Sequence, residues 1–130
     1  MSRAPQLQPH HIERLRVTWP DTDAAGGMHF SAGLRYAETA EAGFRRTLGI
    51  LGDWGQYPRR TISATFHAMP QFDDELEVRL RLDAIGTTSM SWAWEIVCRA
   101  QLCIDGRHVA VHVDAEQRPQ ALPPNVRRDT

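Results

Sequence analysis

The amino-acid sequence predicts an α+β domain in which an antiparallel sheet wraps around one long helix, with the elements in the order β–α–β–β–β–β. One stretch of the chain, residues 31–49, has apolar residues at the spacing of an amphipathic helix. Apolar and polar residues alternate with a period of two once before this stretch and repeatedly after it, which is typical of half-buried strands. A lone amphipathic helix needs a cover for its apolar stripe, and an antiparallel sheet that includes the first strand provides one. Such a sheet has two edges and one uncovered face, and both features favour self-association.

The first strand is predicted at about residues 11–19, and Pro20 ends it because proline cannot donate to a strand ladder. Its apolar positions alternate with polar ones and are Leu15, Val17 and Trp19. Residues 21–27 contain two aspartates, two glycines and small residues, so this segment is predicted to be a loop.

The helix is predicted at about residues 31–49, with Ser31 as its N-cap and Gly49 as its C-terminal stop. Glu41 precedes Arg45 by four residues, which is the favourable orientation for an ion pair on the helix surface. The apolar stripe consists of Leu34, Ala37, Ala40, Phe44 and Leu48. Two small residues, Ala40 and Gly43, indicate a close approach to the helix, either by a sheet or by a second subunit, although small residues are also tolerated at such positions without a close neighbour.

Four strands are predicted after the helix. The first covers residues 61–68 and is followed by a turn at 69–74. The second, residues 75–83, has the clearest alternation, with one face made of Leu76, Val78, Leu80 and Leu82. The third extends over residues 89–104, where eight apolar residues share one parity; a strand of this length is expected to bend or to carry a bulge.

Asp105-Gly106 is the preferred dipeptide of a two-residue hairpin turn, so it is predicted to connect the third of these strands to the last. The last strand is then short, from about Gly106 to Asp114. Residues 1–10 are predicted to be a loose N-terminal tail, residues 11–124 one domain, and residues 125–130 a C-terminal tail.

Composition excludes several classes of function. The chain has 130 residues, enough for one domain with its own core, and a formal net charge of −1. It lacks the basic excess that is typical of binding to nucleic acid or to an anionic membrane surface. Its apolar runs are much shorter than the ~20 residues that span a bilayer, and its first residues contain no apolar stretch typical of a signal peptide. A cytoplasmic location with reduced cysteines is therefore expected.

The loop before the helix is the candidate site. Asp21 and Asp23 are followed by Gly26 and Gly27, and this pattern is also typical of a simple structural turn. A chemical interpretation exists beside the structural one. The start of a helix has unpaired backbone N–H groups and a partial positive charge, which can hold a developing oxyanion. A carboxylate beside these groups can attack the same carbonyl or activate water against it.

The histidines give weaker signals. His29 is the only one close to the acidic loop. His108 and His112 share a strand face but lie ~13 Å apart along it, too far to bind one metal ion. No metal-binding, phosphate-loop or dinucleotide motif is present in the sequence.

The stretch D-T-D-A-A-G-G-M-H-F, residues 21–30, resembles the D-x-D-x-x-G signature of hotdog-fold acyl-CoA thioesterases, and most closely the group of 4-hydroxybenzoyl-CoA thioesterase. Three further stretches fit the same pattern: residues 61–82, the Asp105-Gly106 hairpin and residues 113–123. The resemblance covers most of residues 11–124, and the order of elements derived above is also the hotdog order.

This resemblance implies that Asp23 is the catalytic carboxylate, acting as a nucleophile on the thioester carbonyl or as a general base for water. Asp21 would brace the loop, and backbone amides around residues 28–30 would polarise the carbonyl. The substrate would be an acyl-CoA, with no cofactor or metal. Members of the family form dimers by joining two sheets edge to edge, and often tetramers, with sites at the subunit interface. The residues expected to bind substrate are Gly26, Met28, His29, Phe30, Arg59 and Arg60.

The sequence departs from the family pattern at residues 29–33, in the turn at residues 85–89 and in its last strand, which is expected to be shorter than usual. Some relatives have a catalytic histidine at the position of Phe30, one residue after His29, so His29 does not inherit that role. The turn at residues 85–89, which is basic in the aryl-CoA member, carries no charge here. The remaining arginines that could hold CoA phosphates are Arg59, Arg60, Arg127 and Arg128. Three aromatic residues could line an acyl pocket or belong to the core: Phe30, Trp54 and Tyr57.

Three functions are compatible with these observations. The first is an acyl-CoA thioesterase. The second is a protein of the same fold that binds an acyl thioester without hydrolysing it, which the departures at residues 29–33 and 85–89 favour. The third is an oligomerisation module without a ligand.

Overall fold

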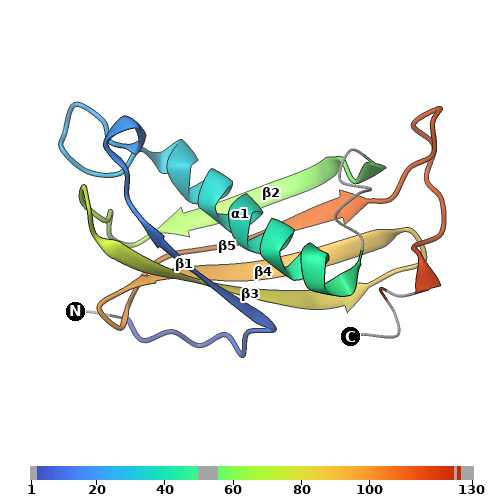
Figure 1. Cartoon of the computed structure of the whole chain (residues 1–130), viewed down its shortest axis with the longest axis horizontal. Coiled ribbons are helices and arrows are strands. Elements are labelled where there is room, and N and C mark those ends of the chain that lie inside the picture. The colour runs from blue at the N-terminus through green and yellow to red at the C-terminus, as the bar shows by residue number, and fades with distance from the viewer. Residues whose placement is uncertain (1–2, 50–55, 125, 127–130) are drawn as a thin grey trace.

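The computed structural model describes residues 3–49, 56–124 and 126, and it contains one helix of 19 residues packed across a five-stranded sheet (Figure 1). The elements in chain order are β1 (His11–Arg16), a 3-10 turn (Trp19–Asp21), α1 (Phe30–Leu48), β2 (Arg59–Phe66), β3 (Glu75–Ile85), β4 (Ser89–Cys98) and β5 (Gln101–Val111). All neighbouring strands are antiparallel, in the order β1-β3-β4-β5-β2. The predicted fold class and element order are confirmed. Among the described residues, no helix has the length and apolar character that crossing a bilayer requires.

Three residues considered in the sequence lie outside the described residues: Trp54, Arg127 and Arg128. The same holds for all of the predicted C-terminal tail except Val126.

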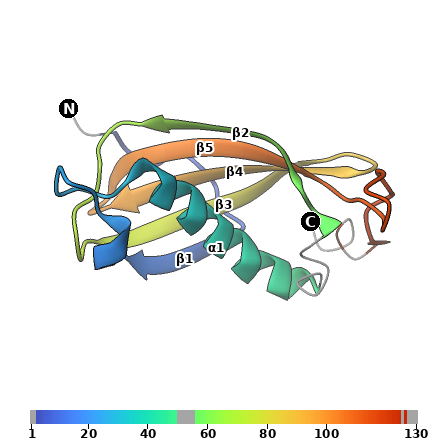
Figure 2. The same ribbon diagram turned by 90° about the horizontal axis from the view of Figure 1, so that it is seen from above.

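The core lies between α1 and the concave face of the sheet (Figure 2). The alternation in β3 is confirmed, because the four leucine and valine positions of one face are buried against the helix layer. Gly49 ends the helix as predicted, with a φ of 75° that glycine adopts without strain. The predicted N-cap is wrong by two residues. His29 caps the helix, and its Nδ1 accepts a hydrogen bond from the amide of Ser31 at 3.2 Å.

The small residues of α1 mark where β1 crosses the helix. A Cβ added to Gly43 would lie 2.6 Å from Oε1 of Glu13 and 2.7 Å from Nε2 of His11. The predicted close approach is therefore made by the sheet. The helix packs mainly against β1, β3 and β4, which leaves the part of the concave face formed by β5 and β2 less covered.

The connection between β4 and β5 differs from the prediction. The hairpin turn consists of Arg99 and Ala100, both with positive φ, as a two-residue hairpin turn requires. Asp105-Gly106 lies inside β5, opposite Glu95 and Trp94. Gly106 is there because the indole ring of Trp94 occupies the space that a Cβ would need. The last strand consequently has 11 residues and is not short.

A β-bulge explains why the sequence showed one unbroken alternation. Val97 pairs with Leu102 but Ile96 pairs with Ile104, so Cys103 is an extra residue in β5. Without the bulge, a two-residue turn would pair each even-numbered residue of β4 with an odd-numbered residue of β5. The extra residue shifts the register by one, so apolar residues of equal parity in β4 and β5 share a face.

The first strand is shorter than predicted. β1 ends at Arg16, and Trp19 begins the 3-10 turn with Pro20 in its first turn. Trp19 is 72% exposed and packs edge-on against the ring of Phe72. Val17 lies just beyond β1 and is buried, and it still pairs with the chain before β3: its amide donates to the carbonyl of Asp74 at 3.0 Å and its carbonyl accepts from the amide of Asp73 at 2.9 Å. Apolar alternation in the sequence therefore continues past the end of the strand.

Residues 1–10 were expected to be a loose tail, but residues 3–8 lie on the sheet face opposite α1 (Figure 2), and the ring of His10 stacks on Phe44 of α1. The amides of Gln6 and Leu7 donate hydrogen bonds to the carboxylate of Glu95, at 3.0 and 2.9 Å. Arg79 donates to the carbonyl of Leu7 at 2.9 Å, and the amide of Leu102 donates to the carbonyl of Arg3 at 2.7 Å. This segment is therefore held on the sheet by specific hydrogen bonds.

Candidate active site

Asp23 lies on the loop between the 3-10 turn and α1, and its side chain is exposed. Its Oδ1 accepts a hydrogen bond from the amide of Ala25 at 2.9 Å, which is the Asx-turn expected of a structural aspartate. The loop closes through hydrogen bonds from the Asp23 amide to the carbonyl of Gly27 and from the Gly26 amide to the carbonyl of Asp23. Gly26 has a φ of 92°, which disfavours any other residue. Oδ2 of Asp23 makes no hydrogen bond with the described residues and is available to a substrate or water.

Asp21 ties this loop to the helix. Its buried carboxylate accepts hydrogen bonds from Arg35 at 2.6 Å, from the hydroxyl of Tyr36 at 2.5 Å and from Thr18 at 2.9 Å. Burial alone would raise the pKa of the Asp21 carboxyl, but the hydrogen bonds from Tyr36, Arg35 and Thr18 outweigh it and hold that pKa below its usual range. Asp21 therefore stays ionised and fixes the base of the loop that carries Asp23.

Replacing Asp21 by asparagine is expected to destabilise the fold in a pH-dependent way. A carboxyl whose pKa is lowered by folding stabilises the native state above its unfolded pKa of about 4, and this stabilisation is lost as the pH falls towards the folded pKa. Asparagine cannot provide a charged acceptor, so the variant should be less stable at pH 7 by about 1–3 kcal/mol. Urea unfolding of both proteins between pH 2 and pH 7 measures the difference. A difference that stays constant down to pH 2 would contradict the assigned role of the charge.

The backbone amides at the start of the helix differ in whether they already donate a hydrogen bond within the chain. The amide of Met28 donates to the carbonyl of Pro70, and that of His29 donates to the carbonyl of Asp21, each at 2.7 Å. The amide of Phe30, the first residue of α1, donates to no other described residue. Within one chain, Phe30 thus provides the available donor at the positive end of the helix dipole.

The side chains at this point of the chain form an aromatic surface. The rings of His29 and Phe30 lie 4.5 Å apart, and Phe30 packs edge-on against Phe66 at the end of β2. The Phe30 side chain is 57% exposed. A thioester that reached the helix start would therefore contact aromatic carbon on one side and the acidic loop on the other.

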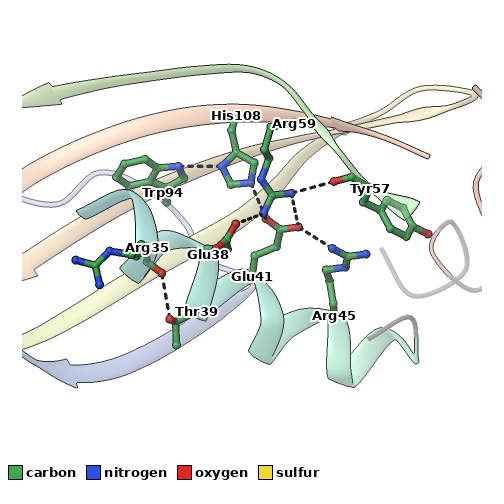
Figure 3. Close-up of polar contacts among 9 residues, drawn as sticks. All are labelled: Arg35, Glu38, Thr39, Glu41, Arg45, Tyr57, Arg59, Trp94 and His108. Carbon is green, nitrogen blue, oxygen red and sulfur yellow. Dashed lines mark hydrogen bonds and ion pairs between the residues drawn. The ribbon is translucent and has the colours of Figure 1, made fainter. Parts of the chain in front are cut away.

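The ion pair between Glu41 and Arg45 was predicted to lie on the helix surface, and this prediction is wrong because the pair is buried. Glu41 and Arg45 are both completely shielded from solvent, and Nη1 of Arg45 lies 3.2 Å from Oε2 of Glu41 (Figure 3). Oε1 of Glu41 also contacts Nε2 of His108 at 2.7 Å and Nη2 of Arg59 at 2.7 Å. Spacing of four residues shows that two side chains share a face but not whether that face is exposed.

The hydrogen bonds of this network define the tautomer of its histidine. The indole N–H of Trp94 can only donate, and it lies 3.2 Å from Nδ1 of His108 (Figure 3). Nδ1 must therefore accept, and Nε2 carries the proton that is donated to Glu41. The sequence contained one signal for the burial of Glu41, because it lies four residues after Ala37 and three before Phe44 on the apolar stripe.

The two arginines expected to bind substrate differ in their surroundings. Arg59 is engaged by Glu41 and by Glu38, whose Oε2 lies 3.3 Å from Nη2 of Arg59. Arg60 follows it in β2 and is exposed. Among residues 3–49, 56–124 and 126, no group of three or more His, Cys, Asp or Glu side chains is arranged to hold a metal ion.

A groove lies between α1 and the edge strand β2, over the part of the sheet that the helix leaves less covered. Its volume is about 130 Å³, and Trp94 and His108 form its floor. A larger hollow of about 670 Å³ is lined by both polar and apolar residues of β1, β3 and the β4–β5 hairpin, and two of them, Arg14 and Glu77, pair with each other at 3.0 Å. The groove beside the helix is the better candidate, because it adjoins Arg35, which contacts Asp21 of the acidic loop.

Comparisons with known proteins agree in the type of relative that they find. The family model of the thioesterase-like superfamily matches residues 17–129 of this chain. A 1,4-dihydroxy-2-naphthoyl-CoA hydrolase of Synechococcus sp. (strain CC9605) is 30% identical over 141 residues, which cover 98% of this chain and 91% of that protein.

Solved structures show the same fold at lower sequence identity. A thioesterase of Thermus thermophilus, crystallised with coenzyme A and zinc, has a TM-score of 0.85 at 20% identity and covers 92% of this chain and 96% of its own. A 1,4-dihydroxy-2-naphthoyl-CoA thioesterase from Synechocystis has a TM-score of 0.80 at 22% identity and covers 90% of this chain and 92% of its own. One helix against a five-stranded antiparallel sheet is thus the architecture of these thioesterases as well.

Proposed function

The chain belongs to the thioesterase-like superfamily and has the hotdog fold, and from this premise we propose that it hydrolyses acyl-CoA thioesters with Asp23 as the catalytic carboxylate. Hydrolysis of an acyl-CoA thioester is the general activity that the family supports. The observation that carries the role of Asp23 is its position. An exposed carboxylate with one uncommitted oxygen sits on a loop that buried Asp21 fastens to α1, a few residues before the helix starts.

In the general-base route, Asp23 takes a proton from water while the water oxygen attacks the thioester carbon. The carbonyl oxygen becomes an oxyanion, which the Phe30 amide and the helix dipole stabilise. The carbon–sulfur bond then breaks, and the CoA thiolate leaves and takes up a proton. In the nucleophilic route, the carboxylate itself attacks the thioester carbon and the carbon–sulfur bond breaks, so that the CoA thiolate leaves and takes up a proton. Water then cleaves the resulting anhydride. The position of Asp23 supports both routes.

The partner molecules follow from the same proposal. Coenzyme A is the thiol part of the substrate, and Arg60 is an exposed cation for its phosphates. The protein is proposed to be a homodimer or a tetramer, because β2 is an edge strand that exposes the apolar residues Ile62 and Phe66. Gly26, Met28 and His29 shape the loop and the helix start against which the thioester is placed.

A protein that binds acyl-CoA without hydrolysing it is the second candidate. It is favoured by the engagement of the Met28 and His29 amides, which leaves Phe30 as the one uncommitted amide of this segment among the described residues. An oxyanion held by one donor is stabilised less than one held by two.

A panel of acyl-CoA thioesters with aromatic and aliphatic acyl groups tests the proposal, with detection of the released thiol. Release of CoA from at least one thioester at rates well above the spontaneous reaction is expected. Tight binding of these thioesters without release of CoA would instead identify the protein as a non-hydrolysing binder.

A further inference from the structure

The outer face of the sheet, which is the face opposite α1, carries a segment of the chain itself. This segment, residues 3–8, is named the N-terminal strap (Figure 2). We propose that the strap, held by the buried carboxylate of Glu95, keeps a second copy of the chain from docking on the outer face, so that self-association is confined to the sheet edges. This inference rests on the proposed pairing through β2 and does not depend on thioester hydrolysis.

Hydrogen bonds fasten the strap to the three central strands, β3, β4 and β5. The carboxylate of Glu95 on β4 accepts hydrogen bonds from the amides of Gln6 at 3.0 Å and Leu7 at 2.9 Å, and Glu95 is only 6% exposed. Hydrogen bonds to an ionised acceptor are about twice as strong as neutral ones, so two successive amides on one buried carboxylate make a firm anchor. Three more hydrogen bonds reach carbonyls of the strap: from Arg79 to Leu7 at 2.9 Å, from Arg81 to Gln8 at 3.0 Å and from the Leu102 amide to Arg3 at 2.7 Å.

The strap covers apolar side chains that α1 does not reach. Ala93, Val97 and Leu102 are buried but lie outside the core cluster beneath the helix. Trp94 and Ile96, which alternate with the first two along β4, belong to that cluster. Without the strap, the outer face would therefore expose an apolar surface across β4 and β5.

The strap forms a ridge on this face. A hollow of about 670 Å³ on one side of it is lined by Pro5 and Val97, and a hollow of about 470 Å³ on the other side is lined by Leu7 and Leu102. Sheets that pack face to face lie ~10 Å apart and interdigitate their side chains. An extended segment between two sheets occupies ~5 Å of this distance. In a two-fold pair each copy would bring its own strap, so the sheets cannot reach packing distance while the straps are in place.

The outer face is large enough to bind a second copy once the strap is released. Five strands ~4.8 Å apart and roughly nine residues long cover about 700 Å², close to the ~800 Å² per partner of a standard interface. Most homo-oligomers are two-fold symmetric, so the apolar surface of one copy would meet the same surface of the other. The strap thus takes the place that a second copy would otherwise fill.

The test changes only the strap and uses the full chain. Gln6→Pro combined with Leu7→Pro removes the two N–H groups that Glu95 binds and leaves every residue of the outer face in place. The molar mass, measured by light scattering after size-exclusion chromatography, is expected to double relative to the unmodified protein. Gln8→Pro is the matched control, because the Gln8 amide donates no hydrogen bond to the described residues, and it should leave the mass unchanged.

A charge placed beneath the released strap identifies the surface that docks. Leu102→Glu, added to the double-proline variant, introduces a carboxylate into the newly exposed apolar surface and should return the mass to its original value. A mass that stays doubled would place the new contact elsewhere and overturn the inference.

Amide hydrogen exchange decides what an unchanged mass means. The Leu102 amide donates to the carbonyl of Arg3, so it should exchange at least about tenfold faster once the strap is released. An unchanged mass with fast exchange at Leu102 would show that the bare outer face binds no second copy. An unchanged mass with slow exchange would show that Glu95 does not hold the strap, and either result overturns the inference. If the unmodified protein is a monomer, the proposed pairing through β2 fails, whereas a doubled mass on release of the strap still supports the inference.

Discussion

Asp23→Asn is expected to lower kcat/KM for thioester hydrolysis by about 10²–10⁴-fold while the fold is retained. The amide keeps the shape of the side chain and its Oδ1, so the turn with the Ala25 amide can still form. It is a far weaker base and nucleophile than a carboxylate, so the attack on the thioester carbon is slowed in both routes. Steady-state release of CoA measures the effect, and the thermal unfolding midpoint verifies the fold.

Asp114 offers a matched control for this substitution. Its Oδ1 accepts hydrogen bonds from the amides of Glu116 and Arg118, so it holds a turn much as Asp23 does, but it lies after β5 and away from the acidic loop. Asp114→Asn should leave kcat/KM unchanged. A loss of only a few-fold in Asp23→Asn, or an equal loss in both variants, would show that Asp23 is a structural residue of its loop.

Glu41→Gln is expected to have the largest effect on stability, a loss of about 3–5 kcal/mol. Glu41 and Arg45 are both fully shielded from water, and Arg45 also stacks its guanidinium over the ring of Tyr57 at 4.0 Å. Removing the negative charge leaves buried Arg45 and the half-buried Arg59 without their shared counter-ion. The glutamine side chain cannot replace the charge, although it fits the same volume. Unfolding in urea, followed by tryptophan fluorescence, measures the change.

Glu38→Gln is the matched control, because Glu38 lies one turn earlier on the same helix and also contacts Arg59. Its side chain is 51% exposed, and exposed ion pairs contribute at most about 1 kcal/mol. If the two variants lost similar amounts of unfolding free energy, the burial of Glu41 would not explain its contribution to stability.

The spacing of apolar residues predicted the helices and strands that bury one face and expose the other. The strand β3 was predicted within two residues, because its leucines and valine alternate with charged residues that face water. The helix was predicted almost in full for the same reason, and Gly49 marked its end. The start of α1 was misplaced by two residues, because Ser31 and His29 can both accept a hydrogen bond from a backbone amide and the structure uses His29.

Prediction failed where a local preference competed with packing. Asp105-Gly106 is a strong turn signal, but Gly106 is required by the neighbouring indole of Trp94, a residue twelve positions away in the sequence. The true turn, Arg99-Ala100, has no turn signature. Long-range contacts of this kind leave no periodic pattern in the sequence.

The acidic loop of the site was visible in the sequence, and its roles stay predictions. The motif identified Asp21 and Asp23 together, and the structure separates them into a buried carboxylate with three partners and an exposed one. The network around Glu41 was not visible, because its members come from α1, β2, β4 and β5. Each residue alone is ordinary for its element, and only the fold brings them together.

The extra residue in the β4–β5 hairpin has a consequence for how the length of this chain can vary. If Cys103 were lost, Ile104 and the residues after it could keep their present partners in β4, because Cys103 has no partner in that strand. The hydrogen bonds that its carbonyl accepts from the amides of His67 and Ala68 would be lost. A deletion in the middle of β5 would instead turn inward-pointing side chains out towards solvent and expel the neighbours of Trp94 from beneath the helix. Homologous chains that differ by one residue in this hairpin are therefore expected to differ at this position and to keep the register between β4 and β5.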